Sequence, residues 1–188
     1  LHLKTFLTAY LKQKYPNHFI QTETGLYGDL LGNIQRATNQ EWNGVCVLLE
    51  WADCDPRLGI RQLGGWQPAH LADILNSVRS VLGRLQEALL ALAQKTAVAL
   101  SLPTLALPPA AYTPTFQHNE FELGLQGLLN DFATHLVQSG SVRLLNPAVL
   151  DRLSAPATRR DVKSEVLFGF PYQMAHVDTL CEQIALLI

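Results

Sequence analysis

The sequence predicts a three-layer α/β/α domain built on a parallel β-sheet. Two observations support this prediction: short apolar runs alternate along the chain with longer amphipathic segments, and the runs are apolar at consecutive positions. Uninterrupted apolar runs are typical of strands that are covered on both faces, as in parallel sheets. Alternation of such strands with helices requires crossover connections, which place helices on both faces. We therefore expect a parallel sheet of about four strands in a single domain over residues 1–188.

The first part of the chain supplies a helix, a short extended run and a buried strand. Residues 1–15 have helical periodicity, and residues 18–22 form a short β-prone run before a turn at 25–28. Residues 45–49 form a continuous apolar run, which predicts a central strand, and a polar loop over 50–67 follows it. The apolar stripe of the first helix consists of Leu3, Phe6, Leu7, Tyr10 and Leu11.

The middle of the chain supplies two longer helices and a second central strand. A helix begins at Pro68 and extends to about residue 92, and residues 96–100 form the next strand. Prolines keep residues 103–114 irregular before a helix over 121–136, which Gly140 ends as a C-cap. The buried stripe of the first of these helices consists of Leu71, Ile74, Leu75, Val78, Leu82, Leu85, Leu89 and Leu92.

The last part of the chain predicts a short strand at 142–145, a helical turn that begins at Asn146-Pro147, and a final helix with apolar positions from Val177 to Ile188. The chain also begins with a helix, where folds of this class usually begin with a strand. We therefore expect it to be a segment of a longer protein whose first strand is missing here.

Composition excludes several classes of function. The net charge is −2 and 16% of the residues are charged, so the basic surface of a nucleic-acid-binding protein is not expected. No apolar run reaches the roughly 18 residues of a membrane span, and the first residues do not have the pattern of a signal peptide. The three cysteines are an odd number without the spacing of a metal site, which favours free thiols in a reducing cytoplasm.

The loop after the first predicted strand carries the densest charge. Within residues 50–61, Asp53 and Asp55 join Glu50 as carboxylates, and Arg57 and Arg61 are guanidinium groups. Binding sites in open parallel sheets form at the carboxyl ends of the strands, so these arginines could be offered to an anionic ligand. The alternative is that Asp–Arg pairs within the loop only hold it in place.

A hydrolase nucleophile is not evident. The chain lacks Gly-Asp-Ser and Gly-x-Ser-x-Gly, and Ser101 follows a strand but precedes Leu-Pro, which does not form an exposed elbow. His176 is the histidine best placed for catalysis, yet Gln173 stands where an orienting carboxylate would be useful. We therefore assign no catalytic residue, with His176 as the one candidate, and a histidine held by structural hydrogen bonds as the alternative.

Three segments give the chain a resemblance to a known family. They are Val47 to Trp66, which includes Glu50-Trp51-Ala52-Asp53-Cys54-Asp55-Pro56-Arg57-Leu58-Gly59-Ile60-Arg61; Arg160 to His176; and Tyr27-Gly28-Asp29. Together they resemble the amino-terminal domain of FkbH-like proteins, subfamily IIIC of the HAD superfamily. The resemblance implies an SGNH-hydrolase-like (flavodoxin-like) fold. It also implies a downstream HAD domain with its own Mg site, so no cofactor or metal is expected in this chain.

SGNH hydrolases need a serine after the first strand, a glycine after the second, an asparagine after the third and an Asp-x-x-His near the end. Gly28 and His176 match two of these positions. Ala52 or Cys54 stands at the asparagine position, and Gln173 replaces the aspartate. The resemblance therefore implies a fold retained without its hydrolase activity.

The family transfers a glyceryl unit to an acyl carrier protein in polyketide and related biosynthesis. The resemblance implies an accessory domain of such a protein, with the carrier protein and the HAD domain as partners. Two alternatives remain: an SGNH-type esterase that lacks its nucleophile segment, and a purely structural domain.

We expect Asp53, Asp55, Arg57, Arg61, Arg160 and His176 to lie near one another at the carboxyl end of the sheet and to bind a ligand or partner. Carrier proteins are acidic, so a docking groove should have an arginine rim and an aromatic wall. The rim candidates are Arg57, Arg61, Arg159 and Arg160. The wall candidates are Trp51, Trp66 and Tyr172. The alternatives are that the arginines only neutralise neighbouring aspartates and that the tryptophans close the core.

Overall fold

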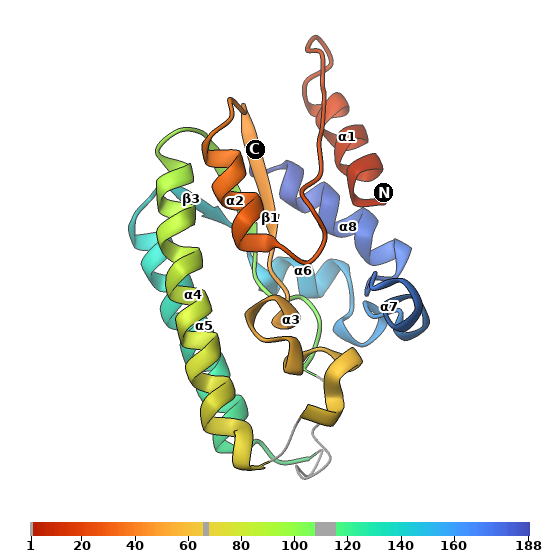
Figure 1. The fold of residues 1–188 in the computed structure, drawn as a ribbon. Coiled ribbons are helices and arrows are strands. Elements are labelled where there is room, and N and C mark those ends of the chain that lie inside the picture. Colours follow the sequence, from red (N-terminus) through yellow and green to blue (C-terminus); the bar gives the residue numbers. More distant parts are fainter. Residues whose placement is uncertain (1, 66–67, 108–115) are drawn as a thin grey trace.

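The computed structural model describes residues 2–65, 68–107 and 116–188, and it confirms the α/β class (Figure 1). Three parallel strands lie in the order β1-β2-β3. The strands are β1 (Gly44–Leu48), β2 (Ala97–Ser101) and β3 (Val142–Leu144). Helices cover both faces, as a three-layer α/β/α fold requires.

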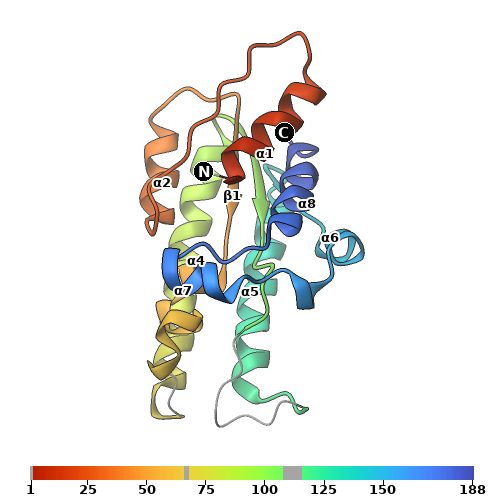
Figure 2. The same ribbon diagram turned by 90° about the vertical axis from the view of Figure 1, so that its right-hand side faces the viewer.

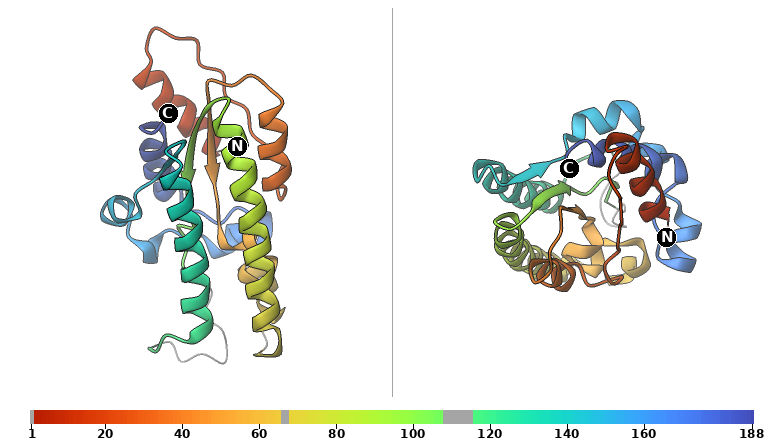
Figure 3. Two further views of the ribbon diagram at one scale, coloured as in Figure 1. Left: turned by 90° about the vertical axis from the view of Figure 1, so that its left-hand side faces the viewer. Right: turned by 90° about the horizontal axis from the view of Figure 1, so that it is seen from above.

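The helices differ widely in length. They are α1 (His2–Lys14), α2 (Leu30–Thr38), α3 (Trp51–Cys54), α4 (Leu71–Ala93), α5 (Glu120–Gln138), α6 (Pro147–Leu153), α7 (Val162–Phe168) and α8 (Met174–Ala185). On one face α4 packs against α2 and α5, and on the other α8 packs against α1 and α6. Figures 2 and 3 show α4 and α5 extending well past the carboxyl ends of the strands. None of the described helices is long and apolar enough to cross a membrane.

The central strand is β2, which is paired on both sides. Val98 aligns with Val45 of β1 and with Val142 of β3. The side chains of Val98, Ala99 and Leu100 are inaccessible to solvent, because helices cover both faces and strands cover both edges. The expectation that residues 45–49 also form a central strand is wrong for the described sheet, in which β1 is an edge strand.

The larger core lies between the sheet and α4 and α5. The predicted stripe of α4 is confirmed, since Ile74, Val78, Leu85 and Leu92 are all at most 2% exposed. Each buried side chain of this size contributes roughly 1.5–3 kcal/mol relative to an exposed one. The helix–helix contact between α4 and α5 is close because Gly124 leaves room for Leu75.

A smaller core lies between α1 and α8. The apolar stripe of α1 is half-buried and packs against Leu105, Tyr172, Val177 and Cys181. The Tyr10 hydroxyl also donates to Asp178 Oδ1 on α8 at 2.6 Å. The stripe predicted for α1 therefore serves this second core and not the main one.

Residues 18–22 and some of the shorter helices differ from what the sequence predicts. Residues 18–22 are extended but pair with no strand, and Phe19 is 91% exposed, so the described sheet has three strands and not four. The helices α2 and α7 were not predicted, because both are short and depend on their caps. Asp29 accepts from the Gly32 amide at the start of α2, and Asp161 caps α7 in the same way.

Candidate functional site

The carboxyl ends of β1 and β2 lead into a buried polar network. Glu50 comes two residues after β1, and its Oε1 accepts hydrogen bonds from Thr104 Oγ1 (2.7 Å), the Thr104 amide (3.1 Å) and the Tyr172 hydroxyl (3.0 Å). Its Oε2 accepts from the Leu105 amide at 3.3 Å. One carboxylate therefore joins the end of β1 to the segment after β2 and to the strand-like residues before α8.

Burial dominates the chemistry of this carboxylate. Desolvation raises the pKa of Glu50 to about 7, although the hydrogen bonds from Thr104, Tyr172 and Leu105 lower it. Three of the four donors are at Oε1, so a proton is expected on Oε2. Burial, together with the charge of Glu50, raises the pKa of the Tyr172 phenol.

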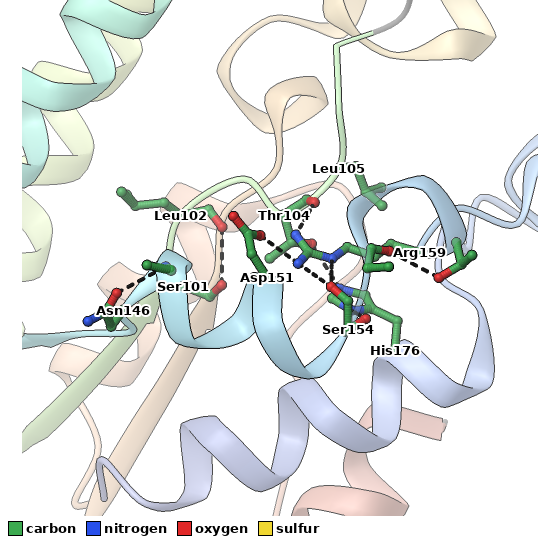
Figure 4. Close-up of polar contacts among 12 residues, drawn as sticks. Ser101, Leu102, Thr104, Leu105, Asn146, Asp151, Ser154, Arg159 and His176 are labelled. Atoms are coloured by element: carbon green, nitrogen blue, oxygen red, sulfur yellow. Dashed lines mark hydrogen bonds and ion pairs between the residues drawn. The ribbon is translucent and has the colours of Figure 1, made fainter.

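His176 belongs to the same network and is 1% exposed (Figure 4). Its Nε2 lies 3.0 Å from Thr104 Oγ1, and its Nδ1 lies 2.9 Å from Ser154 Oγ. Because the Thr104 hydroxyl gives its proton to Glu50, Nε2 must carry the proton and donate, while Ser154 donates to Nδ1. Desolvation and then the charge of Arg159 lower the pKa of His176 to about 4, so the ring is neutral at pH 7.

Arg159 anchors the network to two other chain segments, the residues after β2 and the end of α6. Its Nη1 donates to the Thr104 carbonyl (3.0 Å), its Nε to the Ser154 carbonyl (3.0 Å) and its Nη2 to Asp151 Oδ1 (2.6 Å). Arg159 is 3% exposed, so its expected place on the rim of a docking groove is wrong. We call Glu50, Thr104, Ser154, Arg159, Tyr172 and His176 the Glu50 network.

A second cluster lies within the loop that follows β1. The Arg57 guanidinium donates to both Asp55 oxygens at 2.9 and 2.7 Å and to Asp73 of α4 at 2.8 Å. Burial alone would raise the pKa of Asp55, but the hydrogen bonds from Arg57 hold it below its ordinary value. We call Asp55, Arg57 and Asp73 the Arg57 cluster, and its geometry matches the structural alternative for this loop. Asp53 is likewise used locally, since it accepts from the Glu50 amide at 2.8 Å in the cap of α3.

A third group surrounds Glu165 of α7. Arg160 Nε lies 3.5 Å from Glu165 Oε2, and Arg61 also acts on this carboxylate through its charge. Arg160 Nη2 donates to the Ala106 carbonyl at 2.9 Å. Among the described residues, Glu165 Oε2 is buried and has no hydrogen-bond partner, and burial raises the pKa of this carboxyl.

The six residues selected from the sequence therefore divide among several places. His176 reaches the loop after β1, since one hydroxyl, that of Thr104, lies between its ring and Glu50. Asp55 and Arg57 belong to a separate ion pair, and Arg61 and Arg160 belong to the group around Glu165. Glu50 was among the loop's carboxylates but was not selected. Thr104 and Ser154 were missed, and no local pattern marks them because their partners are distant in sequence.

The remaining candidates have structural positions. Trp51 is 8% exposed and closes the main core, Tyr172 is buried, and Trp66 lies outside the described residues. Ser101 is 2% exposed and donates to the Leu102 carbonyl at 3.1 Å.

The three cysteines are free, and burial raises the pKa of each to about 12. Within the described ranges, no group of three or more His, Cys, Asp or Glu side chains is arranged to hold a metal ion.

Comparisons with known proteins gave no match, whether with protein-family models, with curated proteins or with solved structures. The interpretation of the site therefore depends on its own geometry and on the sequence resemblance. The Glu50 network joins the segments that follow β1, β2 and α6 to one another. It also joins them to the turn before α7 and to the start of α8. Such a network can fix the carboxyl edge of the sheet in one conformation, and Glu50 can take up a proton near neutral pH.

Proposed function

We propose that this chain is a non-catalytic SGNH-like domain of an FkbH-like protein, and that it works in the cytoplasm as a docking module. In this proposal a HAD domain of the same protein loads a glyceryl unit onto an acyl carrier protein. The observation that supports a docking role over hydrolysis is the state of His176. Its ring is 1% exposed, and both of its nitrogens are occupied by Thr104 and Ser154.

A hydrolytic histidine has to accept a proton from a nucleophile that also meets the substrate. The pKa of His176 is lowered to about 4 because the ring is desolvated, which makes it a weak base. Its Nδ1 does lie 2.9 Å from a serine hydroxyl, that of Ser154, and this contact favours the alternative of an esterase. However, Ser154 is at the end of α6, and its carbonyl accepts from Arg159, so it is part of the network's framework.

An esterase assay separates these two functions. We expect no hydrolysis of p-nitrophenyl acetate above the background rate, with or without a serine-directed inhibitor. Ser154→Ala is the matched control, because it removes the hydroxyl that is bonded to Nδ1 of His176. Turnover that both the inhibitor and this substitution abolish would replace the docking proposal with a hydrolase.

The surface best suited to an acidic carrier protein is the exposed side of α7. Lys163 and Arg61 are exposed there, and Figure 2 shows α7 on the outer surface of the molecule. The apolar side chains of this helix that are at least half exposed are Val162, Val166, Leu167 and Phe168. Apolar anchors beside basic groups are the pattern that an acidic amphipathic helix recognises. We call this surface, with Arg61 and Lys163, the α7 face.

Charge reversal tests the α7 face. Lys163→Glu is expected to weaken binding of a holo-acyl carrier protein several-fold, measured by calorimetry at low salt, with the melting temperature nearly unchanged, because Arg61 stays in place beside Glu165. Arg84→Glu is the matched control, since Arg84 is an exposed arginine of α4, a helix that lies on the other side of the molecule from α7 (Figure 1). If the α7-face variant and the Arg84 variant both bind the carrier as tightly as the unaltered chain does, the docking proposal is wrong. It is also wrong if the unaltered chain does not bind the carrier at all.

A further inference from the structure

The arginines of the carboxyl edge differ in how far their donors are used. In Arg57 and in Arg159 all three guanidinium nitrogens donate to oxygens at distances from 2.6 to 3.0 Å. Arg160 uses Nη2 on the Ala106 carbonyl at 2.9 Å. Arg61 is exposed and makes no hydrogen bond within the described ranges. Arg61 and Arg160 therefore keep donors that the described part of the chain leaves unused.

Glu165 is close to both of these arginines and is bonded to neither. Its Oε2 lies 3.5 Å from Arg160 Nε, which is longer than an N–H···O hydrogen bond, and Arg61 acts on the carboxylate through its charge. Glu165 is 8% exposed, and its Oε2 has no hydrogen-bond partner among the described residues. A buried carboxyl oxygen without a donor is costly and uncommon, and a bound molecule is one way to supply the donor.

Three segments that are distant in sequence bring these groups together. The helix α7, which carries Glu165, packs against η2 (Ile60–Gly65), which carries Arg61 (Figures 1 and 2). At the end of α7, Gly169 has a φ of 77°, and its carbonyl accepts from the Tyr27 hydroxyl at 3.0 Å. A side chain at Gly169 would collide with this hydroxyl and would place its Cβ 3.2 Å from Arg61 Nη1. Glycine at this position therefore allows Tyr27 and Arg61 to close in on the end of α7.

A small ion can approach this group from solvent. The side chains of Arg160 and Glu165 keep 22% and 10% of their surface exposed, and Arg61 is exposed. Two guanidinium groups and one carboxylate leave one net positive charge, which favours an anion. The ligand must also bring a donor, because the carboxyl oxygens of Glu165 have none.

These two requirements exclude the simplest anions. A carboxylate or a sulfate has only acceptor oxygens at neutral pH, so it would bond the arginines and be repelled by Glu165. A phosphate group that retains one P–O–H has charged oxygens for the arginines and a proton for the carboxyl. Burial raises the pKa of Glu165, which makes a proton shared between carboxyl and phosphate more favourable.

We propose that Arg61, Arg160 and Glu165 bind a phosphate group that keeps one P–O–H, as free hydrogen phosphate or as a singly protonated phosphate monoester. Its charged oxygens accept from the unused donors of Arg61 and Arg160, and its hydroxyl donates to the Glu165 carboxyl. The inference does not depend on the carrier-protein proposal, because no carrier protein takes part in the binding.

Calorimetric titration with potassium phosphate and potassium sulfate at pH 8 and equal ionic strength tests this site. Both anions are then mainly doubly charged, but only phosphate keeps a P–O–H. We expect phosphate to bind about tenfold more tightly than sulfate, and Arg61→Ala to weaken phosphate binding about tenfold. Arg84→Ala, at an exposed position of α4, is the matched control and should bind phosphate as the unaltered chain does. Glu165→Gln should bind the two anions equally, because its amide can donate to either.

The proposal fails if the unaltered chain binds neither anion or does not distinguish them. It also fails if Arg61→Ala leaves phosphate binding unchanged or if Glu165→Gln still prefers phosphate. A change in the stability of Glu165→Gln does not affect the last comparison, since both anions are measured on the same folded protein. Methyl phosphate at about pH 5.5, where a monoester carries one proton, identifies the source of the group. Tighter binding than inorganic phosphate supports an ester as the ligand, and weaker binding supports the free ion.

Discussion

The Arg57 cluster and the Glu50 network both follow β1, but they are assembled in different ways. Asp55 and Arg57 are two residues apart, and their partner Asp73 is 73% exposed on its side chain. The Glu50 network joins Glu50 to Thr104, Tyr172 and His176, which are far from Glu50 in sequence and almost fully buried. The comparison teaches that the dense charge of the loop is neutralised locally, whereas one less conspicuous carboxylate organises the carboxyl edge.

The comparison predicts that Arg159 is the most damaging position to change. Arg159→Met leaves the carbonyls of Thr104 and Ser154 without their donor in a buried place, so we expect the free energy of unfolding to fall by about 3 kcal/mol. Arg159→Lys is the matched control and should lose clearly less, because an ammonium group can still donate to one carbonyl. Urea unfolding measures both. An equal loss of unfolding free energy in the two variants would mean that the packing of the guanidinium, and not its hydrogen bonds, stabilises the network.

The pH dependence of stability tests the charge state of the network. The pKa of Glu50 is raised from 4.5 to about 7 in the folded chain, so its contribution to stability is present below pH 4.5 and is lost as pH rises through 7. The pKa of His176 is lowered from 6.5 to about 4, so its contribution is present above pH 6.5 and is lost as pH falls through 4. The two effects oppose each other between pH 4.5 and 6.5.

Glu50→Gln separates these two contributions. The amide oxygen can keep the three hydrogen bonds at Oε1, and only the 3.3 Å contact with Leu105 is lost. We expect the stability of this variant to rise between pH 4 and 6.5 and then to stay level, and its advantage over the parent should grow by on the order of 2 kcal/mol from pH 4.5 to 7. Chemical unfolding across this range is the measurement. A constant difference between the two proteins would contradict the raised pKa of Glu50.

The smallest effect is expected in the Arg57 cluster. Asp73→Asn removes a well-exposed partner while Arg57 keeps both contacts with Asp55, so the loss should stay below about 1 kcal/mol and shrink in high salt. Asp55→Asn is the comparison variant and should cost more, since Asp55 is 3% exposed and bonded twice by the guanidinium. Thermal melts at low and high salt compare them. A larger loss for Asp73→Asn than for Asp55→Asn would contradict the local assignment.

Much of the fold could be predicted from the sequence because periodicity reports burial directly. The stripe of α4 and the apolar runs of β1, β2 and β3 all correspond to elements of the structure. Residues 18–22 have strand-like composition but lack a paired neighbour, which no local pattern reveals. The shorter helices α2 and α7 were missed because a cap, and not a long stripe, establishes each of them.

The candidate site was only partly predictable. The sequence placed polar residues after the strands, and His176 did prove to reach the loop after β1 through Thr104. It could not distinguish Arg159, which is buried, from Arg61, which is exposed, because both stand in polar loops. That the docking role belongs to Arg61 and Lys163 remains a proposal.

By itself the sequence determined the α/β class, the longer helices and the parallel sheet, since hydrophobic periodicity and alternation depend only on neighbouring residues. Tertiary structure alone decided which carboxylate joined the network, which arginine became an anchor and which strands lie at the edges of the described sheet. Those outcomes depend on desolvation and on hydrogen bonds between segments that are far apart in the chain, as between Glu50 and Tyr172. The residues next to Glu50 in the sequence do not indicate such distant partners. The partners come together only because the fold brings the strand ends to one edge of the sheet.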